Sequence, residues 1–388
     1  MENPMKIAII ADVLGQENNG TTITVKRLID NLKKRGHDVQ IVSPSASEEA
    51  GYHQVKTIDF KIFNNYVKKN GVELAKPDKD LLREVISACD VVHILMPFAM
   101  GRAAIRIANE LNKPVTTAFH VQPENVTSHF GLQRSKRINR YVYKNFYKNF
   151  YCHAEYIHCP TQFIADMLTA HGYRSDLRVI SNGVDPAYFA AREQKPKEYE
   201  DKFCILSTGR LTKEKCQKDL IKAVSQSKYS DRIQIFIAGD GPLKKKLMRM
   251  GMKLKNPPAI MFHTKEELAK YINFCDLYVH PSYAEIESIA CIEAITCGLV
   301  PVIADSKMSA ARYFALSGEN LYAAGNTRDL AAKIDYMIEH PERIKALSEE
   351  YVTYAEKFRI EKCIDKMEEM FEDAIAHRHP AASADQAQ

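Results

Sequence analysis

Long apolar runs are missing from this sequence of 388 residues. No stretch of about 18 consecutive apolar residues occurs, which excludes a membrane-spanning helix. The first residues also lack the apolar core of a secretory signal peptide and lead directly into an apolar strand pattern. Nine cysteines are present, but no two of them have the Cys-x-x-Cys spacing of a zinc knuckle. We therefore expect reduced thiols and a cytoplasmic location.

Buried strands that alternate with amphipathic helices are indicated along most of the chain. Apolar residues make up 45% of it, charged residues 27%, and the net charge is only +5. The length is enough for roughly two to three domains. Continuous apolar segments that end in turn residues are typical of parallel strands buried on both faces. We predict strands at 6–12, 37–42, 91–96, 114–119, 156–161, 177–185, 203–210, 233–238, 259–262, 276–280 and 299–303.

One stretch, Tyr278–Ile303, combines a strand, a polar turn, an amphipathic helix that ends at Gly298, and a second strand. A helix that opens around Glu287 or Ser288 presents unpaired N–H groups and the positive end of its dipole, so it can bind an anion. Glu285 precedes this helix end, and Glu293 lies within the helix. Carboxylates repel phosphate, so the pair indicates hydroxyl groups on either side of an anion, as in a sugar nucleotide. An ordinary helix with acidic residues in its first turn is the alternative.

The spacing Glu285-x7-Glu293, followed by Pro301-Val302-Ile303, resembles the signature of the retaining glycosyltransferases of family 4. The resemblance implies that the second glutamate binds the ribose of the donor and that the first contacts the donor sugar. Family members normally have Gly-Phe-Gly directly after the first glutamate. This sequence has Ile286-Glu287-Ser288 instead, which adds a negative charge near the expected phosphates.

Further positions match the family's binding site for the donor diphosphate. The segment 209–216 resembles the family's Gly-Arg-Leu-x-x-Glu-Lys-Gly, except that Cys216 replaces the final glycine. Its two cations suit a diphosphate, because arginine binds phosphate bidentately and lysine binds it as a point charge. A solvated surface turn is the alternative for this segment. The resemblance assigns donor binding to Arg210, Lys215, Gly239, Ser288, Ile289, Ala290 and Glu293.

Two candidates lie in the first half of the chain. Gly20 is the nearest match to a Gly-Gly turn that, in the family, approaches the donor phosphate and the acceptor. His120 follows the strand at 114–119, and family members often carry a histidine there that contacts the donor sugar and stabilises the transition state. A structural histidine is the other interpretation. The resemblance thus implies His120 and Glu285 as the catalytic residues.

We expect neither a metal nor a cofactor. Asp-x-Asp, which holds a metal in many sugar transferases, occurs once, as Asp78-Lys79-Asp80. Its position before the apolar segment 81–86 is explained by helix capping. Arg210 and Lys215 can stabilise the leaving diphosphate without a metal. No carboxylate pair identifies itself as a nucleophile, so we expect electrostatic catalysis in which the departing phosphate faces the oxocarbenium-like charge and deprotonates the acceptor.

The fold expected from the resemblance is GT-B, an α/β fold with two Rossmann-like doubly wound domains that face a cleft. The C-terminal helices are expected to return in part to the N-terminal domain. A polar segment at 192–202 indicates a linker between the domains. We predict an acceptor domain at 1–190, a nucleotide-sugar domain at 191–355, a helix that crosses back at 356–376, and a disordered tail at 377–388.

Acidic residues are absent between Glu124 and Glu155. A helix predicted at 134–151 places an apolar face of isoleucine, valine and phenylalanine beside a basic one. Such a helix suits the surface of an anionic bilayer, although it could equally pack on its own domain with the basic face in water. A second acid-free basic run follows at 244–255, and no nucleic-acid recognition motif accompanies either cluster. The basic face would consist of Arg134, Arg137, Arg140, Lys144 and Lys148.

Together with the resemblance, these patterns predict a glycosyltransferase that moves a hexose from a UDP-sugar to a lipid hydroxyl with retention, at the inner face of the cell membrane. In overall appearance the chain is similar to bacterial glycolipid glycosyltransferases of the diacylglycerol type. A second possibility is assembly of a cell-surface polysaccharide on a lipid-linked acceptor. The same fold is also compatible with a nucleotide-sugar epimerase and with a non-catalytic sugar-nucleotide sensor.

Overall fold

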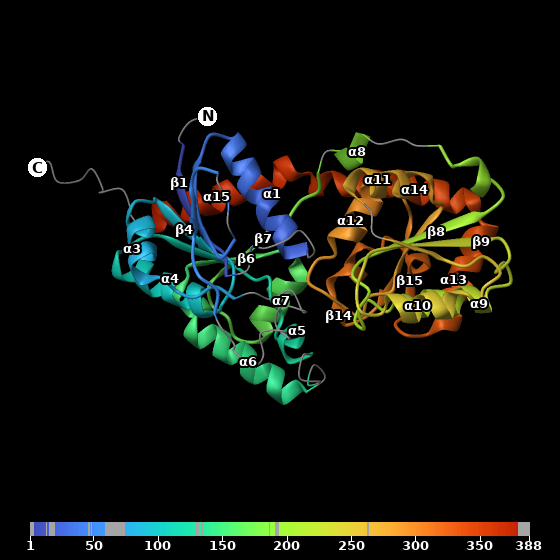
Figure 1. Cartoon of the computed structure of the whole chain (residues 1–388), viewed down its shortest axis with the longest axis horizontal. Coiled ribbons are helices and arrows are strands. Elements are labelled where there is room, and N and C mark those ends of the chain that lie inside the picture. The colour runs from blue at the N-terminus through green and yellow to red at the C-terminus, as the bar shows by residue number, and fades with distance from the viewer. Residues whose placement is uncertain are drawn as a thin grey trace, which may run out of the picture. The chain divides into compact units, whose positions relative to one another are not determined.

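Two compact α/β units make up the chain in the computed structural model (Figure 1). The first comprises Met1–Asn182 together with Cys363–Gln388, and the second comprises Gly183–Lys362. Arg134 and most of the predicted tail lie outside the described residues. The structure describes residues 4–12, 14, 20–45, 47, 49–58, 74–128, 132, 135–185, 187–190, 194–261 and 264–378.

The first unit is built on a sheet of seven parallel strands in the order β3-β2-β1-β4-β5-β6-β7. Every residue of β4, β5 and β6 is buried, as expected for strands covered on both faces. The strand order reverses between β1 and β4, which makes the unit doubly wound. Its strands are β1 Lys6–Ile10, β2 Asp38–Ser43, β3 Tyr52–Gln54, β4 Val91–Ile94, β5 Val115–Ala118, β6 Tyr156–Cys159 and β7 Asp176–Val179.

Helices surround this sheet, and the last helix of the chain is one of them (Figure 1). Helix α15 returns to the first unit, where Arg35 binds Asp365 and Glu368 at 2.6 and 2.5 Å. Arg378, at its other end, binds Glu155 at 2.8 Å. The described α-helices are α1 Gly20–Lys34, α3 Lys79–Ser87, α4 Ala99–Glu110, α5 Pro123–Ser128, α6 Lys136–Asn149, α7 Gln162–Ala170 and α15 Ile360–Arg378.

The second unit is built on a sheet of six parallel strands in the order β10-β9-β8-β11-β13-β15. A short pair, β12 and β14, lies beside it. The strand order reverses between β8 and β11, so this unit is also doubly wound. Its strands are β8 Phe203–Thr208, β9 Ile233–Ala238, β10 Ala259–Met261, β11 Leu277–His280, β12 Ala284–Glu285, β13 Pro301–Asp305, β14 Met308–Ser309 and β15 Leu321–Ala323.

Helices cover both faces of the second sheet (Figure 1). Helices α9, α10 and α13 lie on one face, and α11, α12 and α14 lie on the other. The expected α/β fold with two doubly wound domains and a returning C-terminal helix is confirmed. These helices are α8 Ala187–Ala190, α9 Gln217–Gln226, α10 Lys244–Gly251, α11 Lys265–Phe274, α12 Ile289–Thr296, α13 Thr327–Glu339 and α14 Pro341–Ala355.

Helix α6 is shorter than predicted, and part of its apolar face is buried within the first unit. It spans Lys136–Asn149, and Tyr151 belongs to a short 3₁₀ helix, Tyr151–His153. Phe146 and Phe150 are buried. These two rings of the apolar face therefore pack within the first unit, as in the second of the two interpretations, whereas Ile138 and Val142 are half-buried. The basic side chains Lys136, Arg137, Arg140, Lys144 and Lys148 are exposed.

Several local predictions can be compared directly with the structure. Asp78 is the N-cap of α3, and its side chain accepts a hydrogen bond from the backbone N–H of Leu81 at 3.2 Å. Gly298 follows α12 with φ of 78°, the left-handed conformation that glycine adopts at helix ends. All nine cysteines are free. No helix in the described part of the chain is both long and apolar enough to cross a bilayer.

Candidate functional site

The carboxyl ends of three neighbouring strands bring the predicted donor residues of the second unit together. In the register between β8 and β9, Thr208 pairs with Ala238, so Gly209 and Gly239 follow side by side. In the register between β8 and β11, Leu206 pairs with Tyr278, which places His280 level with Thr208. This edge is the point at which the strand order reverses, where doubly wound sheets bind ligands.

The loops after β8 and β9 pack backbone against backbone. A Cβ atom added to Gly239 would lie 2.0 Å from the carbonyl oxygen of Gly209, so only glycine fits at this position. The N–H of Leu211 donates to the carbonyl oxygen of Asp240 at 2.9 Å and joins the two loops. Arg210, which lies between Gly209 and Leu211, is exposed, and its guanidinium forms no ion pair with the described residues. An exposed cation in this loop is available to an anionic ligand.

Glu285 is the most strongly perturbed acid of this edge. The Nζ atom of Lys215 lies 2.5 Å from its Oε1 atom, and Nε2 of His280 lies 3.2 Å from the same oxygen. The Glu285 side chain is only 10% exposed. Burial by itself raises the pKa of Glu285, but the Lys215 ammonium and the hydrogen bonds from His280 and Lys215 together hold it well below the ordinary value. The carboxylate is therefore ionised at neutral pH.

Helix α12 begins directly after this cluster. Ser288 is its N-cap, with φ of 75° and ψ of 68°, and its backbone carbonyl accepts from the N–H groups of Cys291 and Ile292. The N–H groups of Ile289 and Ala290 have no acceptor within the helix, because each precedes the first complete turn. Glu293 lies one turn further along and is buried. The helix thus has the opening predicted at Ser288, with both predicted donor-binding N–H groups in its first turn.

Gly20 and His120 belong to the first unit. Gly20 is the first residue of α1. His120 follows β5, and its ring centroid lies 5.6 Å from that of His158. Burial, reinforced by His158, lowers the pKa of His120 to about 3, so its imidazole is neutral at physiological pH. The roles predicted for these two residues, like those of the second-unit residues, stay predictions.

His280 and Gln217 were not among the predicted residues. His280 completes an apolar strand and is 2% exposed, so its sequence position suggests only a core residue. Gln217 is buried, and its amide donates to the carbonyl oxygen of Arg210 at 2.9 Å, which fixes the loop after β8. A polar residue at the end of an otherwise apolar strand is the signal that could have identified His280.

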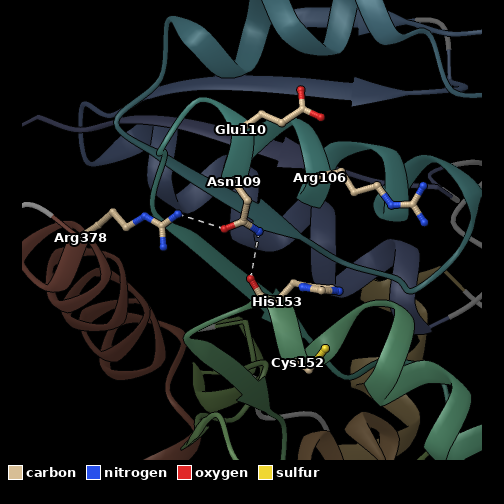
Figure 2. A pocket seen from close by; sticks show the side chains of 6 residues that line it. All are labelled: Arg106, Asn109, Glu110, Cys152, His153 and Arg378. Carbon is tan, nitrogen blue, oxygen red and sulfur yellow. Dashed lines mark hydrogen bonds between the residues drawn. The ribbon is translucent and has the colours of Figure 1, made fainter.

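A hollow of about 530 Å³ in the first unit contains none of the predicted site residues (Figure 2). Arg378 donates a hydrogen bond to Asn109 at 3.0 Å. Figure 2 shows that Arg106 and Glu110 point away from this pair, so the charged groups do not converge on one ligand. The hollow is lined by Arg106, Asn109, Glu110, Cys152, His153 and Arg378.

Two doubly wound units of parallel strands are the architecture of GT-B glycosyltransferases, and comparison with known families agrees. The model of Glycosyltransferase Family 4 matches residues 18–188, and the model of Glycosyl transferases group 1 matches residues 189–358. The two matches meet without a gap and together cover residues 18–358. The chain belongs to glycosyltransferase family 4 and is a glycosyltransferase.

Similar proteins include two named alpha-monoglucosyldiacylglycerol synthases. The one from Streptococcus pneumoniae is 25% identical over 77% of this chain and 71% of its own length. The one from Acholeplasma laidlawii is 23% identical over 89% of this chain and 91% of its own length. A GDP-mannose-dependent alpha-mannosyltransferase from Corynebacterium glutamicum is 29% identical over 77% and 72%.

Among solved structures, HepE from Anabaena in complex with UDP and glucose matches with a TM-score of 0.72. It is 17% identical over 95% of this chain and all of that one. At this identity, the likeness establishes the GT-B fold alone.

Proposed function

We propose that the protein transfers a hexose from a UDP-sugar to a lipid hydroxyl group with retention, at the cytoplasmic face of the membrane. The observation that carries the donor half is the cluster of Lys215, Glu285 and His280 beside the opening of α12. It combines a cation, an ionised carboxylate and N–H groups that have no acceptor within α12, at the edge where doubly wound sheets bind ligands. A sugar nucleotide requires these three kinds of contact.

Each part of the donor has proposed partners. The diphosphate is bound by Arg210, Lys215 and the backbone at Gly239, together with the N–H groups at the opening of α12. Glu293 binds the ribose, and Glu285 binds hydroxyl groups of the sugar. The leaving diphosphate has these protein cations as partners, so we propose that no metal is required. For the first unit we propose Gly20 and His120 as the site residues that the resemblance implies, and the imidazole of His120 is neutral.

In this scheme the transition state is stabilised by electrostatic interactions. Charge develops on the sugar ring as the bond to the diphosphate lengthens, and the departing phosphate lies against it. The same phosphate takes the proton of the acceptor hydroxyl, which then attacks from the face that the diphosphate leaves. Removing one hydrogen-bond donor that faces such developing charge typically raises the activation barrier by about 2.7–4 kcal/mol.

The lipid acceptor is supported by the names of the two diacylglycerol glucosyltransferase relatives and by α6. The exposed face of α6 carries several cations, with Tyr141 69% exposed among them. Each lysine or arginine near an anionic leaflet contributes about 1 kcal/mol of attraction, so the face can hold the protein at a membrane. We propose that this attachment is electrostatic, because Phe146 and Phe150 are buried.

A transfer assay that pairs each radiolabelled nucleotide sugar with each lipid acceptor tests this proposal. UDP-glucose, UDP-galactose and GDP-mannose are each incubated with diacylglycerol vesicles and with a polyprenyl-linked saccharide, and label is followed into the organic phase. We expect label in diacylglycerol from a UDP-hexose. GDP-mannose is included because mannosyltransferases are among the relatives.

Each remaining outcome identifies a different activity. Transfer only from GDP-mannose would overturn the choice of donor. Transfer only to the saccharide would indicate polysaccharide assembly. A nucleotide sugar of altered stereochemistry formed without any acceptor would identify an epimerase.

A further inference from the structure

His280 lies at the centre of the candidate donor site of the second unit. It is the last residue of β11, and only 2% of it is exposed. Its Nδ1 atom lies 3.3 Å from the hydroxyl of Tyr278. Its Nε2 atom lies 3.2 Å from Oε1 of Glu285 and 3.0 Å from the hydroxyl oxygen of Ser288. The imidazole therefore contacts both the acid predicted to bind the sugar and the N-cap of α12.

The partners of the ring define its tautomer. Burial raises the pKa of Tyr278 well above its ordinary value, so the phenol keeps its proton. The phenol hydroxyl can therefore donate to Nδ1. In this arrangement the N–H on Nε2 faces the carboxylate of Glu285. The hydroxyl of Ser288 lies within reach of the same N–H and can share it.

Both protein partners of Glu285 reach the same carboxylate oxygen. Lys215 lies 2.5 Å from Oε1, and His280 approaches that atom from β11. Within the described residues, no hydrogen bond or ion pair involves Oε2. The second oxygen is therefore available to accept a hydrogen bond from a ligand hydroxyl. Two donors on one oxygen also restrict rotation of the carboxylate, so the direction of Oε2 is fixed.

Ser288 occupies a backbone conformation that favours glycine. Its φ of 75° and ψ of 68° are left-handed. The residue is only 8% exposed, so its hydroxyl requires a partner within the protein. His280 is that partner, at 3.0 Å. The bond helps to hold a serine in the conformation from which the first N–H groups of α12 point outward.

We propose that His280 is a positioning residue that couples the two halves of the donor site. One imidazole orients the carboxylate of Glu285 toward the sugar and fixes Ser288 at the opening of α12, where the diphosphate is bound. The inference rests on the proposed function, because it assigns the sugar to Glu285 and the diphosphate to the N–H groups after Ser288. It adds a residue, His280, that was not among the site residues predicted from the sequence.

Three variants separate the two roles. His280→Phe keeps a buried ring and loses the polar contacts with Tyr278, Glu285 and Ser288. His280→Phe combined with Ser288→Gly replaces the serine by a residue that adopts the left-handed conformation freely. His280→Gln places an amide N–H near the position of Nε2 and is the conservative rescue. Tyr351→Phe is the matched control, since it removes a buried hydroxyl that donates to the carbonyl oxygen of Phe314 in the same unit.

The readouts are the Kd of UDP by calorimetry and the kcat with a donor that supports turnover. We expect His280→Phe to weaken UDP binding about fivefold and to lower kcat at least tenfold. Adding Ser288→Gly should restore the UDP affinity and leave kcat low, because Glu285 still lacks its partner. His280→Gln should recover part of kcat. Restoration of kcat by Ser288→Gly, or parental kcat in His280→Phe, would overturn the proposal.

A third readout does not depend on the reaction. Nitrogen-15 NMR of histidine-labelled protein, with the His280 signals assigned from their loss in His280→Phe, reports the tautomer directly. We expect the proton on Nε2 in the parent. A proton on Nδ1 would overturn the proposal even if transfer occurs. Failure of all donors to bind or react, with the Nε2 tautomer intact, would instead overturn the proposed function and with it the catalytic meaning of this network.

Discussion

Replacing Lys215 by alanine tests the ion pair at the centre of the candidate donor site. The side chains of Lys215 and Glu285 are 24% and 10% exposed, and their charged atoms are 2.5 Å apart. Loss of one partner from a fully buried pair costs about 3–5 kcal/mol. This pair retains some contact with water, and His280 remains beside Glu285. We therefore expect Lys215→Ala to lower the free energy of unfolding by about 1–3 kcal/mol.

Arg210→Ala is the matched control, because it removes the same charge from the same loop. Arg210 is exposed and makes no ion pair with the described residues, so the variant should change the free energy of unfolding by less than about 0.5 kcal/mol. Both variants should weaken UDP binding by more than about 1.5 kcal/mol, since both cations are proposed to face the diphosphate. Urea unfolding followed by circular dichroism and calorimetry with UDP measure the two effects.

The pH dependence of the stability difference follows from Glu285. Its pKa in the folded protein is depressed below the ordinary value of 4.5. The pair therefore stabilises the fold above pH 4.5, and this contribution is lost as the pH falls below that value. The stability gap between the parent and Lys215→Ala should narrow in the same range. Equal stability losses in Lys215→Ala and Arg210→Ala, or unchanged UDP affinity in both, would refute this reasoning.

Three further predictions concern the two glutamates of the donor site, the N-cap of α3 and the basic face of α6. Glu293→Gln should weaken binding of UDP itself, whereas Glu285→Gln should leave UDP binding nearly intact and lower turnover; equal losses of UDP affinity would contradict the two roles. Asp78→Ala should lower the free energy of unfolding by about 1 kcal/mol because the helix cap is lost, and the variant should remain active in excess EDTA. A strict manganese requirement in the parent that the substitution abolishes would contradict this. On α6, reversing four charges should release the protein from anionic vesicles without affecting UDP binding. The parent should itself be released almost completely at high salt, because Phe146 is buried. Flotation of the variant with the vesicles as efficiently as the parent would contradict this. The reversed residues are Arg137, Arg140, Lys144 and Lys148.

The main strands could be predicted because their apolar runs are continuous, as the fully buried β4, β5 and β6 illustrate. The strands that were missed are short or polar. Strand β3, Tyr52–Gln54, has no buried residue, and β15 covers only Leu321–Ala323. Neither has enough apolar residues in sequence to stand out from a loop. Their position is determined by pairing with β2 and β13, which only the folded sheet reveals.

The sequence predicted the residues of the candidate site better than it predicted the contacts between them. Lys215 and Glu285 were each identified from motifs, but they lie 70 positions apart, and their pairing depends on the packing of the loops that follow β8 and β11. His280 was interpreted as part of an apolar strand. For α6, helical periodicity separated a basic from an apolar face correctly, but it could not show what covers Phe146. Amphipathic patterns are the same for a helix on a domain and a helix on a membrane.

The most direct test of the proposed reaction is the configuration of the sugar in its product. The protein is incubated with UDP-α-glucose, or the UDP-hexose that supports transfer, and diacylglycerol vesicles, and the purified lipid product is analysed by proton NMR. Retention predicts a glycolipid whose anomeric coupling constant is that of an α-linked sugar, with UDP released in equal amount. A β-linked product would contradict the retaining mechanism, and free sugar without any glycolipid would contradict transfer to a lipid hydroxyl.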